Sequence, residues 1–395
     1  MTLDEIKAAY DDNIMCTYRR AEVAFERGAG CLLYDTDGNE WLDCLAGIAV
    51  CGLGHAHPAV AAAIAEQAAR VMHTSNLYYI LRQAELAAEL LSTCDLDKAF
   101  FCNSGAEAIE CSLKLARKWG KIERGGASGI VATHGSFHGR TMGAVTVTGQ
   151  PKYHEPFTPL VPGVCHVPYG EIDALAAAVD DQTAAVVLEP IQGESGVRVP
   201  PEGYLPAVRR LCDKRGALLI LDEVQTGLGR TGAWYGHQHE GIVPDVMALA
   251  KSLGAGFPIG ACLGRAPYCD VLQPGDHAST FGGNPLASAA GVAFLRTMKS
   301  EGIVEHAASV GAYAMGRLGA LKGVTEVRGR GLMIGLGIAN GKAQEVNVDL
   351  FRRRVLANAI GDDTLRILPP LIITKAEIDR FAAALEASLR DARVS

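Results

Sequence analysis

The feature that most constrains the fold is a series of short apolar segments, each too short for a buried helix. They are KAFFCN (98–103), GIVATH (129–134), AAVVLE (184–189), ALLILDE (217–223) and DVMALAK (245–251). Continuous apolar runs of this length are typical of strands in a parallel sheet that is covered on both faces. Helical patterns such as AEAIECSLKLARKWG and EGYLPAVRRLCDKRG lie between them. This alternation predicts an α/β domain with a mainly parallel sheet.

The pattern changes after about Gly283. Helical LASAAGVAFLRTMKSEG is followed there by a strand candidate, RGRGLMIGLGIA, and by a final amphipathic helix, AEIDRFAAALEASLRDARV. The 395 residues provide between two and three domains of about 150 residues each. We therefore expect a large domain over residues 56–285 and a smaller α+β domain built from residues 1–55 and 286–395.

Three successive apolar runs end in a charged residue. AAVVL ends in Glu189, ALLIL in Asp222 and VMALA in Lys251, at spacings of 33 and 29 residues. Such spacings accommodate one strand and a return connection, so the three charges can meet at one edge of the sheet. Ligands of open α/β sheets bind outside the carboxyl ends of the strands. The sequence therefore predicts a site at this edge.

Lys251 is the candidate nucleophile of this site. It precedes SLGAGFPIG, a glycine-rich loop that permits close approach of the backbone to a ligand. A partly desolvated lysine loses its proton well below its free pKa of about 10.4 and can then attack a carbonyl. The alternative is a structural lysine that forms a buried salt bridge with Asp222 or Glu189.

A second signal lies in FFCNSGAEAIE, directly after a predicted strand. Ser104 and Glu107 have the spacing of a capping box at the start of an amphipathic helix. The free amides and the dipole of a helix N-terminus favour an anion. This turn therefore predicts a phosphate site, although most capping boxes bind no ligand.

Composition excludes several classes of partner. With 44 acidic and 37 basic side chains the net charge is −7, which disfavours nucleic acid and anionic lipid. No apolar run reaches the length of about 18 residues that crosses a membrane, and the opening MTLDEIKAAYDD lacks the order of a signal peptide. The 11 cysteines form no C-x-x-C pair, as expected for reduced thiols. We expect a cytoplasmic protein that binds neither nucleic acid nor membrane.

Two motifs suggest other chemistry. GLGRTG, from Gly227 to Gly232, matches the dinucleotide pattern G-x-G-x-x-G and would indicate an NAD-dependent oxidoreductase. EVQT separates it from the strand, however, and no helical pattern follows. HAH at 55–57 and HQH at 237–239 lack a third ligand at suitable spacing. We therefore predict no metal site.

Taken together, these residues resemble the class III pyridoxal-phosphate-dependent aminotransferases, which transfer terminal amino groups. Within that class the resemblance is greatest to the acetylornithine branch. The matching stretches are LAGIAVCGLGHAHP, SNLYY, NSGAEA, FHGRT, EPIQGESGV, LDEVQTGLGRTG, ALAKSLGAGFPIGA, STFGGNPLA, RGRGLMIGL and LRILPPLIIT. The resemblance implies a fold-type I enzyme whose large domain contains a mainly parallel, seven-stranded sheet.

The resemblance also implies a role for individual residues. Lys251 would hold pyridoxal 5'-phosphate covalently and move a proton between the substrate carbon and the cofactor. Asp222 would keep the pyridine nitrogen protonated, which makes the ring an electron sink. Further implied cofactor contacts are Phe137 and Val224 on opposite ring faces, Gln225 near the phenolic oxygen, and Ser104, Gly105 and Ala106 at the phosphate.

Three residues would bind the substrates by the same resemblance. Arg140 would hold a substrate carboxylate, for which a guanidinium fork is suited. Arg366 would pair with Glu194 while an amino donor is bound, and would open to hold the α-carboxylate of 2-oxoglutarate. Either arginine could instead form a surface or structural ion pair. Thr280 would reach the phosphate of the neighbouring subunit, which implies a homodimer.

The expected reaction is transfer of the δ-amino group of N2-acetyl-L-ornithine to 2-oxoglutarate. Succinyl-diaminopimelate, ornithine and 4-aminobutyrate are alternative donors, and a cofactor-binding protein without turnover is a further alternative. Several positions depart from the pattern of the acetylornithine branch and leave the donor open. They are Cys51, Ile80, Leu81, Ser195, Ser252 and Ala255.

Overall fold

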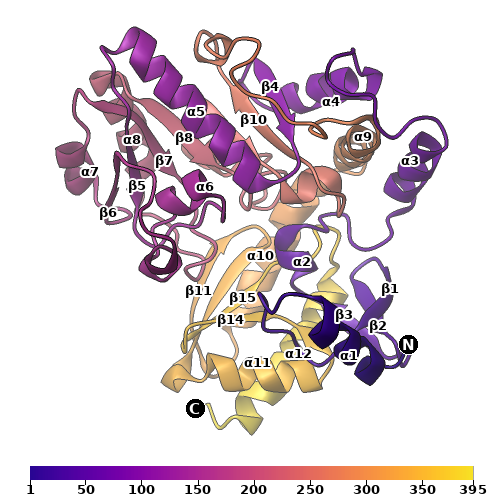
Figure 1. The fold of residues 1–395 in the computed structure, drawn as a ribbon. Helices are drawn as coiled ribbons and strands as arrows, with labels where there is room; N and C mark the ends of the chain where they lie inside the picture. Colours follow the sequence, from indigo (N-terminus) through magenta and orange to yellow (C-terminus); the bar gives the residue numbers. More distant parts are fainter. Residues whose placement is uncertain (395) are drawn as a thin grey trace.

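A computed structural model describes residues 1–394 and has a seven-stranded sheet at its centre (Figure 1). The strand order is β4-β10-β9-β8-β7-β5-β6. The strand β10 runs antiparallel to both neighbours, and the four pairs from β9 to β6 are parallel. The strands are β4 (Lys98–Cys102), β5 (Gly129–Thr133), β6 (Val164–Val167), β7 (Thr183–Leu188), β8 (Leu218–Asp222), β9 (Val246–Leu249) and β10 (Gly260–Gly264).

All five predicted strands are present in this sheet, and the predicted α/β class is confirmed. The strands β6 and β10 were not predicted from the sequence. The sequence of β10, GACLG, has glycine at both ends and reads as a loop, yet all five of its residues are buried between β4 and β9. The sheet supplies the environment that favours this strand, because propensity there depends on packing against neighbours.

Successive residues of the central strands face different helices because side chains alternate along a strand. In β8, Leu218 and Ile220 pack in the cluster that contains α5, whereas Leu219 and Leu221 pack with α7 and α8. Helices therefore cover both faces of the sheet (Figure 1). The helices of this part of the chain are α3 (Pro58–Ala68), α4 (Leu81–Leu91), α5 (Gly105–Glu123), α6 (Met142–Val147), α7 (Ile172–Ala178) and α8 (Tyr204–Arg215).

Two smaller sheets lie below the large one in Figure 1. In the first, β13 near the C-terminus pairs in parallel with β3 near the N-terminus, so the two ends of the chain share one sheet. The first sheet contains β1 (Phe25–Ala29), β2 (Leu32–Asp35), β3 (Glu40–Asp43) and β13 (Val355–Leu356). The second contains β11 (Val324–Arg330), β12 (Met333–Ile338), β15 (Thr364–Ile367) and β14 (Asn358–Ile360).

The segment RGRGLMIGLGIA, predicted as one strand, instead forms the end of β11 and all of β12. Gly331 lies between them at φ +54°, a conformation that glycine adopts without strain. The remaining α-helices are α1 (Leu3–Asn13), α2 (Ala46–Ala49), α9 (Pro285–Ser300), α10 (Ile303–Gly319), α11 (Ala343–Arg352) and α12 (Lys375–Asp391). Short 3-10 helices are η1 (Pro151–Tyr153), η2 (Glu155–Phe157), η3 (Gly236–Glu240), η4 (Lys251–Gly254), η5 (Tyr268–Asp270) and η6 (Ala339–Gly341).

The helix α9 connects the two parts of the molecule. It packs against α3 and α4 beside the large sheet, and it also contacts α10 of the C-terminal part. The domain boundaries at residues 55 and 285 remain a prediction. Within residues 1–394, no helix combines the length and the apolar character needed to cross a bilayer.

Candidate active site

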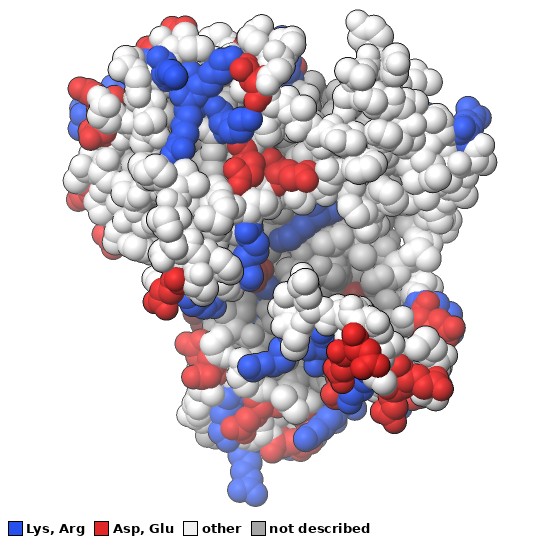
Figure 2. Space-filling view, in the orientation of Figure 1, with Lys and Arg blue, Asp and Glu red and all other residues white. Residues whose placement is uncertain are grey.

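A cavity of about 330 Å³ lies at the carboxyl ends of β7, β8 and β9. This volume is at the lower end of the range for small-molecule sites. Nine of the predicted site residues line it: Ser104, Gly105, Ala106, Phe137, Glu194, Asp222, Val224, Gln225 and Lys251. In the space-filling view a hollow separates the upper and lower parts, and charged side chains of both signs lie around it (Figure 2).

The three charged residues predicted to converge do so. Glu189 follows β7, Asp222 ends β8, and Lys251 follows β9 after one intervening residue. All three line the same cavity. The parallel arrangement of β7, β8 and β9 explains this convergence, because it brings their carboxyl ends to one edge of the sheet.

Lys251 is partly buried at the start of η4, where its backbone has a φ of +47°. Burial lowers the pKa of its amine from 10.5 to about 8, against the opposing effect of the Glu194 carboxylate. The salt-bridge alternative is not observed, because the ion pairs among residues 1–394 do not include Lys251. The side chain is therefore available as a nucleophile with an amine that is partly neutral near pH 7.

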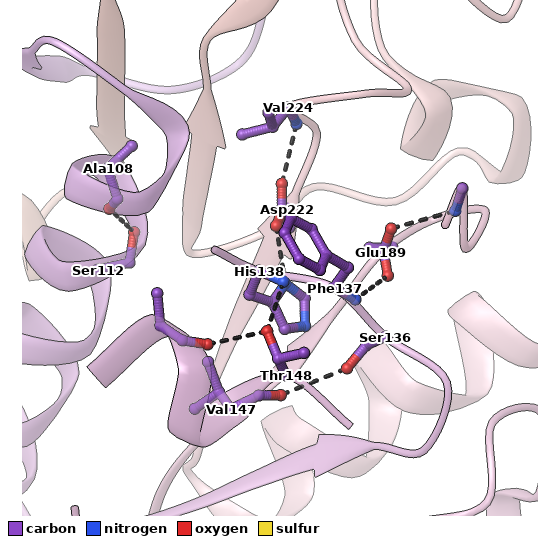
Figure 3. Close-up of polar contacts among 12 residues, drawn as sticks. Ala108, Ser112, Ser136, Phe137, His138, Val147, Thr148, Glu189, Asp222 and Val224 are labelled. Carbon is purple, nitrogen blue, oxygen red and sulfur yellow. Dashed lines mark hydrogen bonds and ion pairs between the residues drawn. The ribbon is translucent and has the colours of Figure 1, made fainter. Parts of the chain in front are cut away.

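The Asp222 carboxylate is buried and held in place at both oxygens (Figure 3). Its Oδ1 accepts a hydrogen bond from the Val224 amide at 3.0 Å, and its Oδ2 lies 2.7 Å from Nδ1 of His138. The His138 amide in turn donates to Thr148 Oγ1 at 2.8 Å. Burial acts to lower the pKa of His138, but the hydrogen bond and charge of Asp222 outweigh it and raise this pKa.

His138 was not predicted from the sequence as a functional residue. The sequence does contain a clue to His138. It lies in FHGRT, directly after Phe137, which was predicted to contact the cofactor. The charge-assisted pair with Asp222 fixes the orientation of that carboxylate toward the cavity.

Glu189 supports the backbone around the cavity. Its Oε2 accepts from the Phe137 amide at 3.1 Å, and its Oε1 accepts from the Gly193 amide at 3.2 Å (Figure 3). Burial raises the pKa of this carboxyl from 4.5 to about 7. Glu189 thus connects the segment that carries Phe137 with the segment that precedes Glu194.

The N-terminus of α5 opens into the cavity at Ser104, Gly105 and Ala106. Ser104 Oγ accepts from the Glu107 amide at 3.2 Å, which confirms the first half of the predicted capping box. The second half was wrong. Glu107 Oε2 accepts from the Asn103 amide at 2.5 Å, one residue before the cap. The early amides of the helix remain without partners within it and can bind an anion.

Arg366, on β15, is 1% exposed and pairs with Glu194. Its Nη1 lies 2.6 Å from Glu194 Oε1, and Gln225 Nε2 donates to the same oxygen at 3.2 Å. Burial acts to raise the pKa of Glu194, but the charge of Arg366 outweighs it and lowers this pKa. Nη2 of Arg366 donates to Asn358 Oδ1 at 2.9 Å, and Asn358 was not predicted as a site residue.

Three predicted site residues do not line the cavity. Arg366 lies behind Glu194 and Gln225, which do line it. Arg140 is exposed and follows Gly139, a lining residue. Thr280 is exposed and lines a separate cavity.

The positions that depart from the acetylornithine pattern also lie outside the cavity lining. Ser252 is buried and donates to the Ala49 carbonyl at 3.0 Å, and Ser195 donates to Gln192 Oε1 at 3.2 Å. Ala255 has a φ of +48°. The two serine contacts are structural, and none of the departing positions belongs to the lining of this cavity.

The dinucleotide pattern GLGRTG does not open a helix in the structure. Its Arg230 is 1% exposed and donates through Nη1 to the carbonyls of Leu332 and Pro369, at 3.1 and 2.5 Å. The motif therefore joins the large sheet to the C-terminal part. Within residues 1–394, no cluster of three or more potential ligands has the geometry of a metal site.

The chain belongs to the class-III aminotransferases, since the model of that family matches residues 16–389. Among named relatives, it is 49% identical to the acetylornithine aminotransferase of Gloeobacter violaceus, over 96% of both chains. Solved structures are also similar. That of ornithine aminotransferase from Toxoplasma gondii ME49 has a TM-score of 0.95 at 34% identity, covering 100% of this chain and 96% of that one. That of acetylornithine aminotransferase from Elizabethkingia anophelis has a TM-score of 0.88 at 31% identity, covering 99% of this chain and 100% of that one.

Proposed function

We propose that this aminotransferase moves the δ-amino group of N2-acetyl-L-ornithine to 2-oxoglutarate. The products are N-acetyl-L-glutamate 5-semialdehyde and L-glutamate, and the reaction is a step of arginine biosynthesis. The observation that carries the proposal is a single cavity that joins Lys251, with its lowered pKa, to the Asp222 carboxylate and to a helix N-terminus. Relatives named acetylornithine aminotransferase, 46 to 50% identical over most of the chain, support the choice of donor.

The donor set of the cavity fits pyridoxal 5'-phosphate. Lys251 would hold the cofactor covalently, and Asp222 would face its pyridine nitrogen. A Cβ at Gly105 would lie 3.0 Å from both methyl groups of Val224, so glycine allows the N-terminus of α5 to pack closely against Val224. Ser104, Gly105 and Ala106 would hold the phosphate, Phe137 and Val224 the ring faces, and Gln225 the phenolic oxygen. When bound, the cofactor supplies an electron sink.

Residues of the chain orient this chemistry. The Lys251 amine exchanges its proton near neutral pH and is therefore suited to move a proton at the substrate carbon. Asp222 keeps its carboxylate oriented toward the cavity because His138 and the Val224 amide hold both of its oxygens. Phe137 is kept in position through its backbone by Glu189.

The substrate carboxylates would be bound at two arginines. Arg140 would bind the carboxylate of either substrate at the mouth of the cavity. Arg366 pairs with Glu194, and this pair would neutralise the second arginine while a donor is bound. If Glu194 turned away, Arg366 could bind the α-carboxylate of 2-oxoglutarate. One site could then take a terminal amine and a keto acid in turn.

The protein would act as a homodimer. Large apolar side chains are exposed around the segment from residue 71 to 81, and this side of the molecule shows few charges (Figure 2). They are Val71, Met72, Leu77, Tyr78, Tyr79 and Leu81, with exposures of 40 to 108%. Apolar clusters of this kind mark protein contacts. Thr280 would then reach the phosphate of the partner's site. Sedimentation at micromolar concentration should show a dimer, and a monomer would contradict this.

A cytoplasmic location is part of the proposal, and the thiols support it. The 11 cysteines are all free within the described chain, and nine of them are buried or half-buried. Free thiols in such number are expected in a reducing compartment.

The function is tested by the visible absorption spectrum of the purified protein. We expect a yellow protein whose absorption band shifts on addition of N2-acetylornithine alone and returns with 2-oxoglutarate. Ornithine, succinyl-diaminopimelate and 4-aminobutyrate form the comparison panel. An efficiency for acetylornithine no better than that for ornithine would overturn the donor. A band indifferent to every amine would indicate a protein without turnover, and no band after reconstitution with the cofactor would refute the proposal.

A further inference from the structure

The surroundings of Arg140 differ from those of most exposed arginines in this chain. Its Cζ lies 4.2 Å from the ring centroid of Tyr153 and 5.3 Å from that of Phe137. The two rings meet edge to face, with centroids 5.9 Å apart and planes at 76°. None of the ion pairs formed among residues 1–394 includes Arg140. Aromatic rings therefore hold this guanidinium, and no carboxylate of the described chain occupies its donors.

We infer that Tyr153 is the positioning residue that holds Arg140 ready for a substrate carboxylate. The inference rests on the proposed function, in which Arg140 binds that carboxylate. A guanidinium attracted to a ring face keeps its N–H donors in its own plane, where they remain free for a bidentate anion. A carboxylate partner from the protein would compete for the same donors. Tyr153 thus orients the Arg140 guanidinium and leaves its N–H donors free to bind a carboxylate.

The same contact connects Arg140 to the cavity. Phe137 lines the cavity, and its amide donates to Glu189 Oε2 at 3.1 Å. Because Tyr153 touches both Phe137 and Arg140, it links the arginine to a residue of the cavity wall. Lys152 Nζ lies 4.9 Å from the Tyr153 ring centroid and adds a second positive charge at this place.

Tyr153 is itself anchored through the histidine that follows it. The His154 ring hydrogen-bonds the Thr148 carbonyl and packs against His166 of β6, with centroids 5.5 Å apart. His166 stacks in turn on His134 at 5.7 Å, directly after β5. Burial lowers the pKa of His166 to about 4, so its ring stays uncharged at pH 7. The segment of Tyr153 is thereby attached to the edge of the large sheet.

The backbone on the other side of Arg140 is held independently. Glu110 Oε1 accepts from the amides of Gly143 and Ala144, at 2.8 and 3.3 Å, in the first turn of α6. Loss of the Tyr153 ring should therefore release the side chain of Arg140 and leave its backbone in place. A defect in carboxylate binding with the fold intact is the expected result.

The test measures glutarate binding to the holoenzyme by calorimetry in Tyr153→Leu and Tyr153→Phe. We expect the Kd for glutarate to rise about tenfold in Tyr153→Leu, which is the scale of a lost cation–π contact. In Tyr153→Phe, which keeps the ring, this Kd should change less than about twofold. Phe157→Leu, which changes an exposed aromatic residue of the adjacent η2, is the matched control and should bind normally. The KM of both substrates should rise in Tyr153→Leu with kcat nearly constant. The rate with n-butylamine, which has no carboxylate, should not change.

The variant Arg140→Leu distinguishes a failure of the inference about Tyr153 from a failure of the proposed role of Arg140. If Arg140→Leu weakens glutarate binding and Tyr153→Leu does not, the inference is overturned and the proposed function stands. If neither variant weakens it, the assigned role of Arg140 fails as well. An equal loss of rate with n-butylamine and with acetylornithine in Tyr153→Leu would show a general structural role and would also overturn the inference.

Discussion

The floor and the rim of the cavity are built in different ways. The floor, which we define as Glu189, Asp222 and Lys251, comes from the ends of neighbouring parallel strands in one sheet. The rim, defined as Arg140 and Glu194 together with Arg366 behind Glu194, comes from two loops and from β15 of another sheet. A floor fixed by sheet geometry suits chemistry common to both substrates. A rim on separate elements can respond to the substrate that is bound.

Removal of the floor lysine should have the largest effect. In Lys251→Ala the amine that moves the proton is lost, and transamination should fall by a factor on the order of 10⁴ or more for every donor. Initial rates of glutamate formation measure this. Lys214→Ala, an exposed lysine in the last turn of α8, is the matched control and should be fully active. Near-normal transamination in Lys251→Ala would refute the role of this residue.

The pH dependence of the floor should be the next largest effect. Because burial lowers the pKa of Lys251 to about 8, its neutral and reactive fraction rises with pH until that value and then levels off. The rate at which the apoprotein takes up pyridoxal phosphate should rise about fiftyfold between pH 6 and pH 8, and little above pH 9. Stopped-flow absorbance follows this uptake. A rate that still increases tenfold per unit above pH 9 would show an ordinary lysine.

The sequence predicted the floor better than the rim, and the reason is physical. A charge at the end of a short apolar run marks the carboxyl end of a buried strand, and parallel strands bring such ends together. No local sequence pattern indicates what an arginine in a loop, or on a strand of another sheet, will contact in the folded protein. Arg140 and Arg366 were candidates only through resemblance to a family, and Asn358, which contacts Arg366, had no signal at all.

The fold likewise contains elements that the sequence predicted and elements that it did not. Strands with continuous apolar residues were found, whereas β10 was missed because its sequence, GACLG, becomes a strand only between two partners. His138 was missed for a related reason. Its function depends on Asp222, which lies 84 residues later in the chain and meets it only in the folded protein.

A variant of the rim should change selectivity more than rate. In Glu194→Gln the buried guanidinium of Arg366 loses its charged partner and should bind the carboxylate of 2-oxoglutarate more readily. The ratio of the KM for acetylornithine to the KM for 2-oxoglutarate should increase about tenfold. Steady-state kinetics in both substrates measure this ratio.

Glu326→Gln is the matched control for that variant, since Glu326 forms an exposed ion pair with Arg328 at 2.9 Å. It should leave the ratio unchanged, because exposed pairs contribute little. An equal loss of kcat for both half-reactions in Glu194→Gln, without a change in the ratio, would place Glu194 with the floor and remove the distinction between the two regions.

The smallest effect is expected for a substitution at Ala255, which belongs to neither the floor nor the rim. Ala255 has a φ of +48°, a conformation that costs a non-glycine residue about 1 kcal/mol, and Ala255→Gly removes this strain. Glycine loses more conformational freedom on folding, which offsets about 0.5–1 kcal/mol of the gain. Stability to urea should therefore stay within about 0.5 kcal/mol of the parent. Because Ala255 does not line the cavity, the preference for acetylornithine over ornithine should also stay the same. A preference that shifted several-fold would mean that donor choice is set behind the floor, and the rim would lose its assigned role in selectivity.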